Sequence, residues 1–289
     1  MICPAPRVIT FDIGRPPTDR FTTAEPLCIA EMLSLIEELA DLGVERIRLL
    51  LHNVEALDDF ERLIHYARGR RCKVTAVCRA AADAASITAI AAAKPDAIAV
   101  PLHSHTADIH RAVAGEIDWS QSIYLARTVR ETGMALEIET TITSGNALPL
   151  LPLSEVVESL HAASWHLDFS RARLSDAIAT SAATALVHIA ASGRMRVSVH
   201  ELPLLRGIVR RHAAGLPPAT PPLVVTTGVT DTMHVSWSGD VQTGGVVVGN
   251  VRAQTLDTIQ ELSRARRKPR LRGGAEITEV RGSLLRASA

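Results

Sequence analysis

The stretch that decides the fold, residues 22–69, reads TTAEPLCIAEMLSLIEELADLGVERIRLLLHNVEALDDFERLIHYARG. Its first part places apolar residues at helical spacing, which predicts an amphipathic helix over residues 24–42. We expect Thr22 or Thr23 to cap this helix, with Glu25 completing a capping box. A short apolar run, RIRLLL, and a second helix follow. A strand between helices at this spacing is typical of βα units around a parallel sheet.

The same unit recurs along the chain. Strands are predicted over 7–13, 46–51, 73–78, 97–102, 135–141, 165–169 and 196–200. Helices are predicted over 24–42, 57–68, 80–93, 120–132, 153–163 and 175–192. Parallel strands joined by right-handed crossovers in such a series indicate an α/β fold, a complete or partial parallel (β/α) barrel.

The chain is predicted to change character after this barrel. Residues 1–215 hold the βα units, and residues 216–222, LPPATPP, form a proline-rich linker. Residues 223–289 then form a small appendage. In it, alternating segments on both sides of Ser238-Gly239-Asp240 predict a β-hairpin, and a short helix follows over 256–267.

Composition limits the class of protein. The 31 basic residues balance the 31 acidic ones, so no overall field favours nucleic acid. No apolar run reaches the ~18 residues of a membrane span, and no signal peptide is visible, so we expect a cytoplasmic protein. The four cysteines form no CxxC pair, which argues against a disulfide scaffold.

The phase of each strand predicts which side chains line the barrel interior. Apolar residues should face the outer helices, and the alternate residues should then face inward. The polar residues placed inward in this way are Asp12, Arg48, His52, His103, Glu137, Glu139, His166, Asp168 and His200. Glu137 lies deeper than Glu139, and a buried carboxylate needs a partner, so we expect a structural ion pair between Arg48 and Glu137.

Barrel active sites lie at the carboxyl ends of the strands. Three interpretations of this region stay open: a solvated barrel mouth, a cavity that binds a polar small molecule or peptide, or a repurposed active site. In the third, a divalent metal would be held by some of the histidines with Glu139 or Asp168, or a histidine–carboxylate pair would do acid–base chemistry. The candidates are Asp12, His52, His103, Glu139, His166, Asp168 and His200.

Several segments together resemble the radical SAM family, in particular members with a SPASM tail. The resemblance spans about residues 7–270 and rests on the order of its segments. These are TTAE, ELADLG, FERLIHYARG, LEIETTIT, RVSVHELPLLRGIVRR and SGDVQTGGVVVGNVRAQTLDTI. The resemblance implies a barrel that binds a [4Fe–4S] cluster and S-adenosylmethionine.

The residues that this chemistry needs are missing. The family holds its cluster by a CxxxCxxC loop after the first strand, whereas residues 11–21 here read FDIGRPPTDRF. The family's glycine-rich turn after the second strand aligns with Leu51-His52-Asn53-Val54, and the tail has no cysteine. We therefore expect no [4Fe–4S] cluster and no reductive cleavage of S-adenosylmethionine.

Two functions follow as hypotheses. The first is a cluster-less homologue that serves as a binding or accessory partner in modifying a peptide or small metabolite, with a genuine radical SAM enzyme as its partner. The second is an enzyme that has reused the barrel mouth for metal-dependent or acid–base chemistry. Binding of S-adenosylmethionine without cleavage is a third, and the loss of the glycine turn argues against it.

Overall fold

The computed structural model describes residues 8–16, 23–52, 56–78, 83–114, 118–170, 172–192, 194–200, 202, 208, 223–227, 232–243, 246–267 and 276–280. The chain divides into two compact units. Unit 1 comprises residues 1–98 and 229–274, and unit 2 comprises residues 99–228 and 275–289. Strand β4, Ala97–Pro101, contains the point of division.

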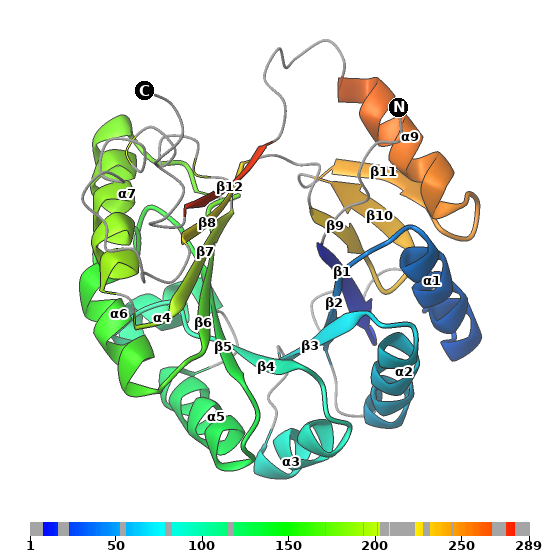
Figure 1. The fold of residues 1–289 in the computed structure, drawn as a ribbon, viewed down its shortest axis with the longest axis horizontal. Coiled ribbons are helices and arrows are strands. Elements are labelled where there is room, and N and C mark those ends of the chain that lie inside the picture. The colour runs from blue at the N-terminus through cyan, green and yellow to red at the C-terminus, as the bar shows by residue number, and fades with distance from the viewer. Residues whose placement is uncertain are drawn as a thin grey trace. The chain divides into compact units, whose positions relative to one another are not determined.

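Unit 1 joins the first βα units to strands from late in the chain (Figure 1). Its strand order is β11-β10-β9-β1-β2-β3. Its elements are β1 Val8–Ile13, α1 Ile29–Asp41, β2 Arg46–Leu51, α2 Leu57–Gly69, β3 Lys73–Cys78, α3 Ala84–Ala92, β9 Thr232–Val235, β10 Asp240–Thr243, β11 Val246–Asn250 and α9 Leu256–Arg267. Strand β1 pairs in parallel with both β2 and β9, and β10 turns back antiparallel to β9.

Unit 2 contains the later βα units, with strand order β4-β5-β6-β7-β8-β12. Its elements beyond β4 are α4 Ala107–Ala114, α5 Trp119–Glu131, β5 Leu136–Thr141, α6 Leu150–Ser159, β6 Ser164–Asp168, α7 Asp176–Ala191, β7 Arg196–His200, β8 Leu223–Thr227 and β12 Glu276–Val280. Strands β5 to β8 run parallel, and β12 closes the order antiparallel to β8. Figure 1 shows α5, α6 and α7 along one face of β5–β7.

The strand phases predicted from the sequence are confirmed on β5 and β6. On β5 the side chains of Leu136, Ile138 and Thr140 are buried, while those between them are partly exposed. Trp165 and Leu167 are fully buried on β6, again with partly exposed residues between them. The apolar core therefore lies between the strands and their helices, and the alternate residues form a polar face.

Helix α1 begins later than the sequence pattern predicts. The expected cap is Thr22 or Thr23, but the helix starts at Ile29 and its N-cap residue is Cys28. Glu31 at the third helical position accepts a hydrogen bond from the Cys28 amide at 2.7 Å. The prediction is wrong because the backbone just before Cys28, which includes Pro26, is extended and contacts residues from late in the chain.

The remaining differences concern segments without a strong pattern. Helix α4, which the sequence pattern does not predict, lies between β4 and α5. The hairpin around Gly239 is confirmed as the β9–β10 turn. The proline-rich linker, residues 216–222, lies outside the described residues. The predicted domain boundaries stay a prediction.

Candidate functional site

At the carboxyl end of β1, the carboxylate of Asp12 lies between two imidazoles. His52, directly after β2, places its Nε2 atom 2.9 Å from Asp12 Oδ1 in a hydrogen bond. His234, on β9, places its Nε2 atom 3.0 Å from Asp12 Oδ2. This second nitrogen is buried and forms no hydrogen bond within the described part of the chain, so the contact is electrostatic. Three strands of unit 1 thus contribute one side chain each.

Asp12 is only 6% exposed, yet its carboxyl group stays ionised. Burial raises its pKa, but the contacts from His234 and His52 lower it further, to about 2 from the ordinary 3.8. An ionised carboxylate only accepts hydrogen bonds, so Nε2 of His52 is the donor in the bond to Asp12 Oδ1.

Sequence reasoning places Asp12 and His52 correctly at neighbouring strand ends, but it does not identify His234. The signal is present, because His234 lies between the buried residues Met233 and Val235 and so faces away from them. The sequence does not show which strand pairs with β9. The parallel pairing of β9 with β1, with Thr10 opposite His234, joins segments from opposite ends of the chain.

In unit 2, the other candidates fall into rows across the polar face of the sheet. Glu139 on β5 lies opposite His166 on β6. One step nearer the carboxyl ends, Asp168 on β6 lies opposite His200 on β7. Directly paired residues on neighbouring strands point to the same face of the sheet, and so do residues two apart on one strand, such as His166 and Asp168. All four side chains therefore share one face. The structure therefore forms two neighbouring carboxylate–imidazole rows, as the strand phases predict.

The loops above these rows are fixed by Asn146, which is 1% exposed. Its amide nitrogen donates to the carbonyl oxygens of His103 and Thr141 at 2.9 and 2.8 Å. Its oxygen accepts from the Thr143 amide at 2.7 Å. Asn146 therefore joins the loop after β4 to the loop after β5, a role that the sequence does not suggest.

His103 lies within the same region. It is buried, and both its side chain and its backbone amide form hydrogen bonds. Its Nδ1 atom accepts a hydrogen bond from the Thr141 amide at 3.1 Å, and its own amide donates to Nδ1 of His110 at 3.0 Å. The two rings stack with their centres 5.3 Å apart. These contacts suit a structural role, and a catalytic role for His103 stays a prediction.

Arg48 belongs to unit 1 and Glu137 to unit 2, so the ion pair expected between them stays a prediction. For a metal, the described residues hold no group of three or more histidine, cysteine, aspartate or glutamate side chains placed to bind one ion. None of the described helices is long and apolar enough to cross a membrane.

The segment that joins β1 to α1 does not fit an iron–sulfur cluster. Such a cluster needs several thiolates, and the only cysteine in residues 14–28 is Cys28. Cys28 is exposed and begins helix α1. On the other side of the segment, Arg15 places its guanidinium 4.5 Å from the centre of the Trp237 ring and donates to the Ala24 carbonyl at 2.7 Å. The side chain of Arg15 therefore lies against Trp237 and Ala24 near the start of this segment.

Comparison with known proteins identifies the fold. No family model matches the sequence, and no curated protein matches it. Among solved structures, SuiB of Streptococcus suis bound to S-adenosylmethionine aligns over 89% of this chain and 65% of its own, with a TM-score of 0.62 and 10% identity. SuiB bound to its precursor peptide SuiA aligns over 90% and 65%, with a TM-score of 0.62 and 12% identity.

A further structure, anSMEcpe with bound AdoMet, aligns over 88% of this chain and 80% of its own, with a TM-score of 0.55 and 12% identity. These proteins are radical SAM enzymes. At such low identity the likeness establishes the fold, and it confirms the predicted class, a parallel (β/α) partial barrel of the radical SAM type. This chain spans 65% of the length of SuiB.

Proposed function

We propose that this chain is a cluster-less radical SAM homologue that serves as a binding or accessory partner in the modification of a peptide or small metabolite. It would bind its ligand at the strand ends and would not cleave S-adenosylmethionine. Its partner would be a genuine radical SAM enzyme that supplies the chemistry.

The observation that carries this proposal is the segment between β1 and α1. This is where the resembled family holds its cluster, and here the segment offers one exposed cysteine, Cys28, at a helix start. Iron–sulfur clusters are held by several thiolates, so the chain's own residues do not supply the ligand set.

Two further observations support a binding role. Polar side chains converge at the strand ends of each unit: Asp12, His52 and His234 in one, and the rows of Glu139 and Asp168 in the other. In addition, one of the similar structures holds a precursor peptide, which makes a peptide the favoured ligand class.

The repurposed metal enzyme gains no support from the described side chains. No three potential ligands among them are placed to bind one ion, and the Nδ1 atom of His103 already accepts a backbone hydrogen bond. The binding role therefore explains more of the observed geometry than the metal-dependent alternative.

The test is an assay of a candidate radical SAM partner enzyme with its peptide substrate, in the presence and absence of the chain. We expect product formation to rise at least several-fold when the chain is added. An Asp12→Asn, His234→Ala double variant should lose most of this stimulation, because the strand-end site is dismantled. The matched control, Arg70→Ala, removes exposed contacts with Glu37 and Tyr66 away from the strand ends and should stimulate fully. Equal rates with and without the chain would contradict the proposal.

A further inference from the structure

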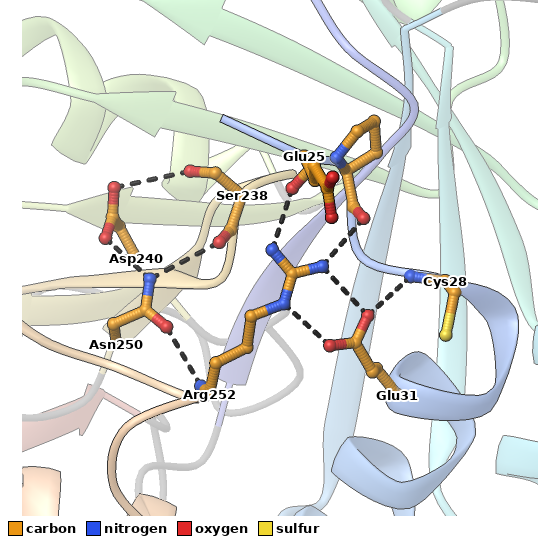
Figure 2. Close-up of polar contacts among 8 residues, drawn as sticks. Glu25, Cys28, Glu31, Ser238, Asp240, Asn250 and Arg252 are labelled. Carbon is orange, nitrogen blue, oxygen red and sulfur yellow. Dashed lines mark hydrogen bonds and ion pairs between the residues drawn. The ribbon is translucent and has the colours of Figure 1, made fainter. Parts of the chain in front are cut away.

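A strap from late in the chain lies against the segment that precedes α1 (Figure 2). We define this strap as residues 236–243 and 246–256. Its central residue is Arg252, whose guanidinium contacts three groups at once. It donates to both carboxylate oxygens of Glu31, at 2.6 and 3.0 Å. It also donates to the carbonyl oxygens of Glu25 at 2.9 Å and Pro26 at 2.8 Å.

Glu31 connects this contact to the start of helix α1. The same carboxylate that binds Arg252 accepts the Cys28 amide, so one side chain links the strap to the helix cap. The hydrogen bond from Arg252 is the largest cause that lowers the pKa of Glu31 to about 2. Two parallel N–H···O bonds between a guanidinium and a carboxylate fix orientation as well as distance, which a lysine could not do.

The strap is itself fixed by Asn250, as Figure 2 shows. The Asn250 side chain accepts the Arg252 amide at 2.9 Å and donates to Asp240 at 2.9 Å and to the Ser238 carbonyl at 3.3 Å. Gly239, between them, has φ +88°, and a Cβ atom there would lie 3.0 Å from Val251. Glycine is therefore needed for this turn to pack under Arg252.

A second anchor involves Trp237, at the turn of the hairpin. Its carbonyl accepts the Leu27 amide at 2.9 Å, and its ring carries the Arg15 guanidinium, which donates to the Ala24 carbonyl. Together with the contacts of Arg252 and Glu31, one backbone polar group of every residue from 24 to 28 has a partner. Each residue of this segment is thus held at one backbone atom by a partner outside residues 24–28.

We propose that this strap keeps residues 24–28, which lead into α1, ordered without any metal, close to where radical SAM proteins use a cluster. The inference rests on the proposed function in one respect, that no cluster is present. It adds a consequence for the ligand site, because β9, which carries His234, runs directly into the strap. Arg252 is therefore a positioning residue for the site formed by Asp12, His52 and His234.

The test is hydrogen–deuterium exchange on the full chain at pH 7 in the presence of a chelator, read by peptides that cover residues 23–31. In Arg252→Ala we expect the amides of Leu27 and Cys28 to exchange at least 10-fold faster than in the unaltered protein. Arg252→Lys keeps the charge but not the two parallel bonds, so its exchange should lie between the two. The control, Arg70→Ala, removes the ion pair with Glu37 on the same helix α1 and should leave this segment unchanged.

The imidazole of His234 gives a second readout that a merely local effect would not move. In the otherwise unaltered protein, Asp12→Asn should shift the NMR resonance of the His234 imidazole. In the Arg252→Ala background, the same substitution should no longer shift it. If Arg252→Ala does not fold, Arg252→Lys and Gly239→Ala decide the question by the same two readouts. If the hydrogen–deuterium exchange of residues 23–31 were unchanged in folded variants, the proposed role of the strap would be wrong. A cluster absorbance after anaerobic addition of iron and sulfide would instead overturn the proposed function, so the two failures are distinguishable.

Discussion

The strand ends of the two units carry similar side chains but are assembled differently. In unit 1, Asp12 and His52 come from early strands, and His234 comes from a strand near the end of the chain. In unit 2, the rows that include Glu139 and Asp168 come from consecutive strands. The unit 2 rows therefore follow from local βα structure, whereas the unit 1 site depends on docking of the late strand and its strap. Substitutions in each unit should show whether its strand ends depend on local structure or on docking of the late strand.

The largest effect is expected in unit 2, at Asn146. Asn146→Ala would leave the Thr143 amide and the His103 and Thr141 carbonyl oxygens without their partner. Each buried group that loses its hydrogen bond costs about 1–3 kcal/mol, so we expect a loss of about 3 kcal/mol in the free energy of unfolding. Urea titration measures it, with Ser144→Ala at an exposed neighbouring position as control. A loss similar to that of the control would show that these loops do not depend on Asn146.

In unit 1, Asp12→Asn should destabilise the protein somewhat less. The pKa of Asp12 is lowered from 3.8 to about 2, and a tenfold change in an acid's dissociation constant corresponds to about 1.4 kcal/mol, so the ionised carboxylate contributes about 2 kcal/mol at neutral pH. Denaturant titration at pH 7 checks this, with the exposed Asp108→Asn as control. If Asp12→Asn proved as stable as the unaltered protein, the two imidazole contacts would not stabilise the charge.

The same carboxylate predicts that stability depends on pH. Because the folded pKa lies below the unfolded one, the contribution is complete above pH about 4 and is lost as the pH falls toward 2. Glu31 also has a pKa of about 2, but it is exposed, so screening reduces its contribution. Unfolding free energies measured from pH 5 to pH 2 should fall by about 2 kcal/mol more in the unaltered protein than in Asp12→Asn. Parallel curves would contradict this assignment.

The smallest expected effect is a gain of stability in unit 2. Helices α5 and α6 end alike, but the residue after the C-cap is Gly133 at φ +78° in one and His161 at φ +53° in the other. A left-handed conformation disfavours residues with a Cβ atom, so His161→Gly should stabilise the protein by about 0.5 kcal/mol. The reciprocal change Gly133→His should destabilise it by a similar amount. Thermal unfolding of both variants would reveal opposite shifts, and shifts of the same sign would contradict the argument.

These differences also explain how much can be predicted from the sequence. The period of two along β5 and β6 is enough to place Glu139, His166 and Asp168 on one face, because the apolar residues between them must pack against helices. The contribution of His234 cannot be predicted, because nothing local to β9 shows that it pairs with β1.

The start of helix α1 escapes sequence-based prediction for the same reason. Local chemistry favours Thr22 or Thr23 as the cap, but the contacts that Arg252 makes with the Glu25 and Pro26 carbonyl oxygens hold this backbone extended. The residues that make these contacts are more than 200 positions away in the sequence, so no local pattern reveals them. The sequence therefore predicts the repeated units and the hairpin around Gly239, but not the contacts of the strap with residues 24–28.

We propose that this chain, whose fold is similar to that of radical SAM enzymes, works without a cluster. The most direct test is anaerobic reconstitution of the full chain with iron and sulfide, followed by incubation with S-adenosylmethionine and a low-potential reductant. Chromatography then quantifies 5′-deoxyadenosine, with a catalytically competent radical SAM enzyme as the positive control. We predict no stable iron–sulfur absorbance and no 5′-deoxyadenosine above the protein-free background. A stoichiometric cluster with 5′-deoxyadenosine formed by this chain alone would contradict the account.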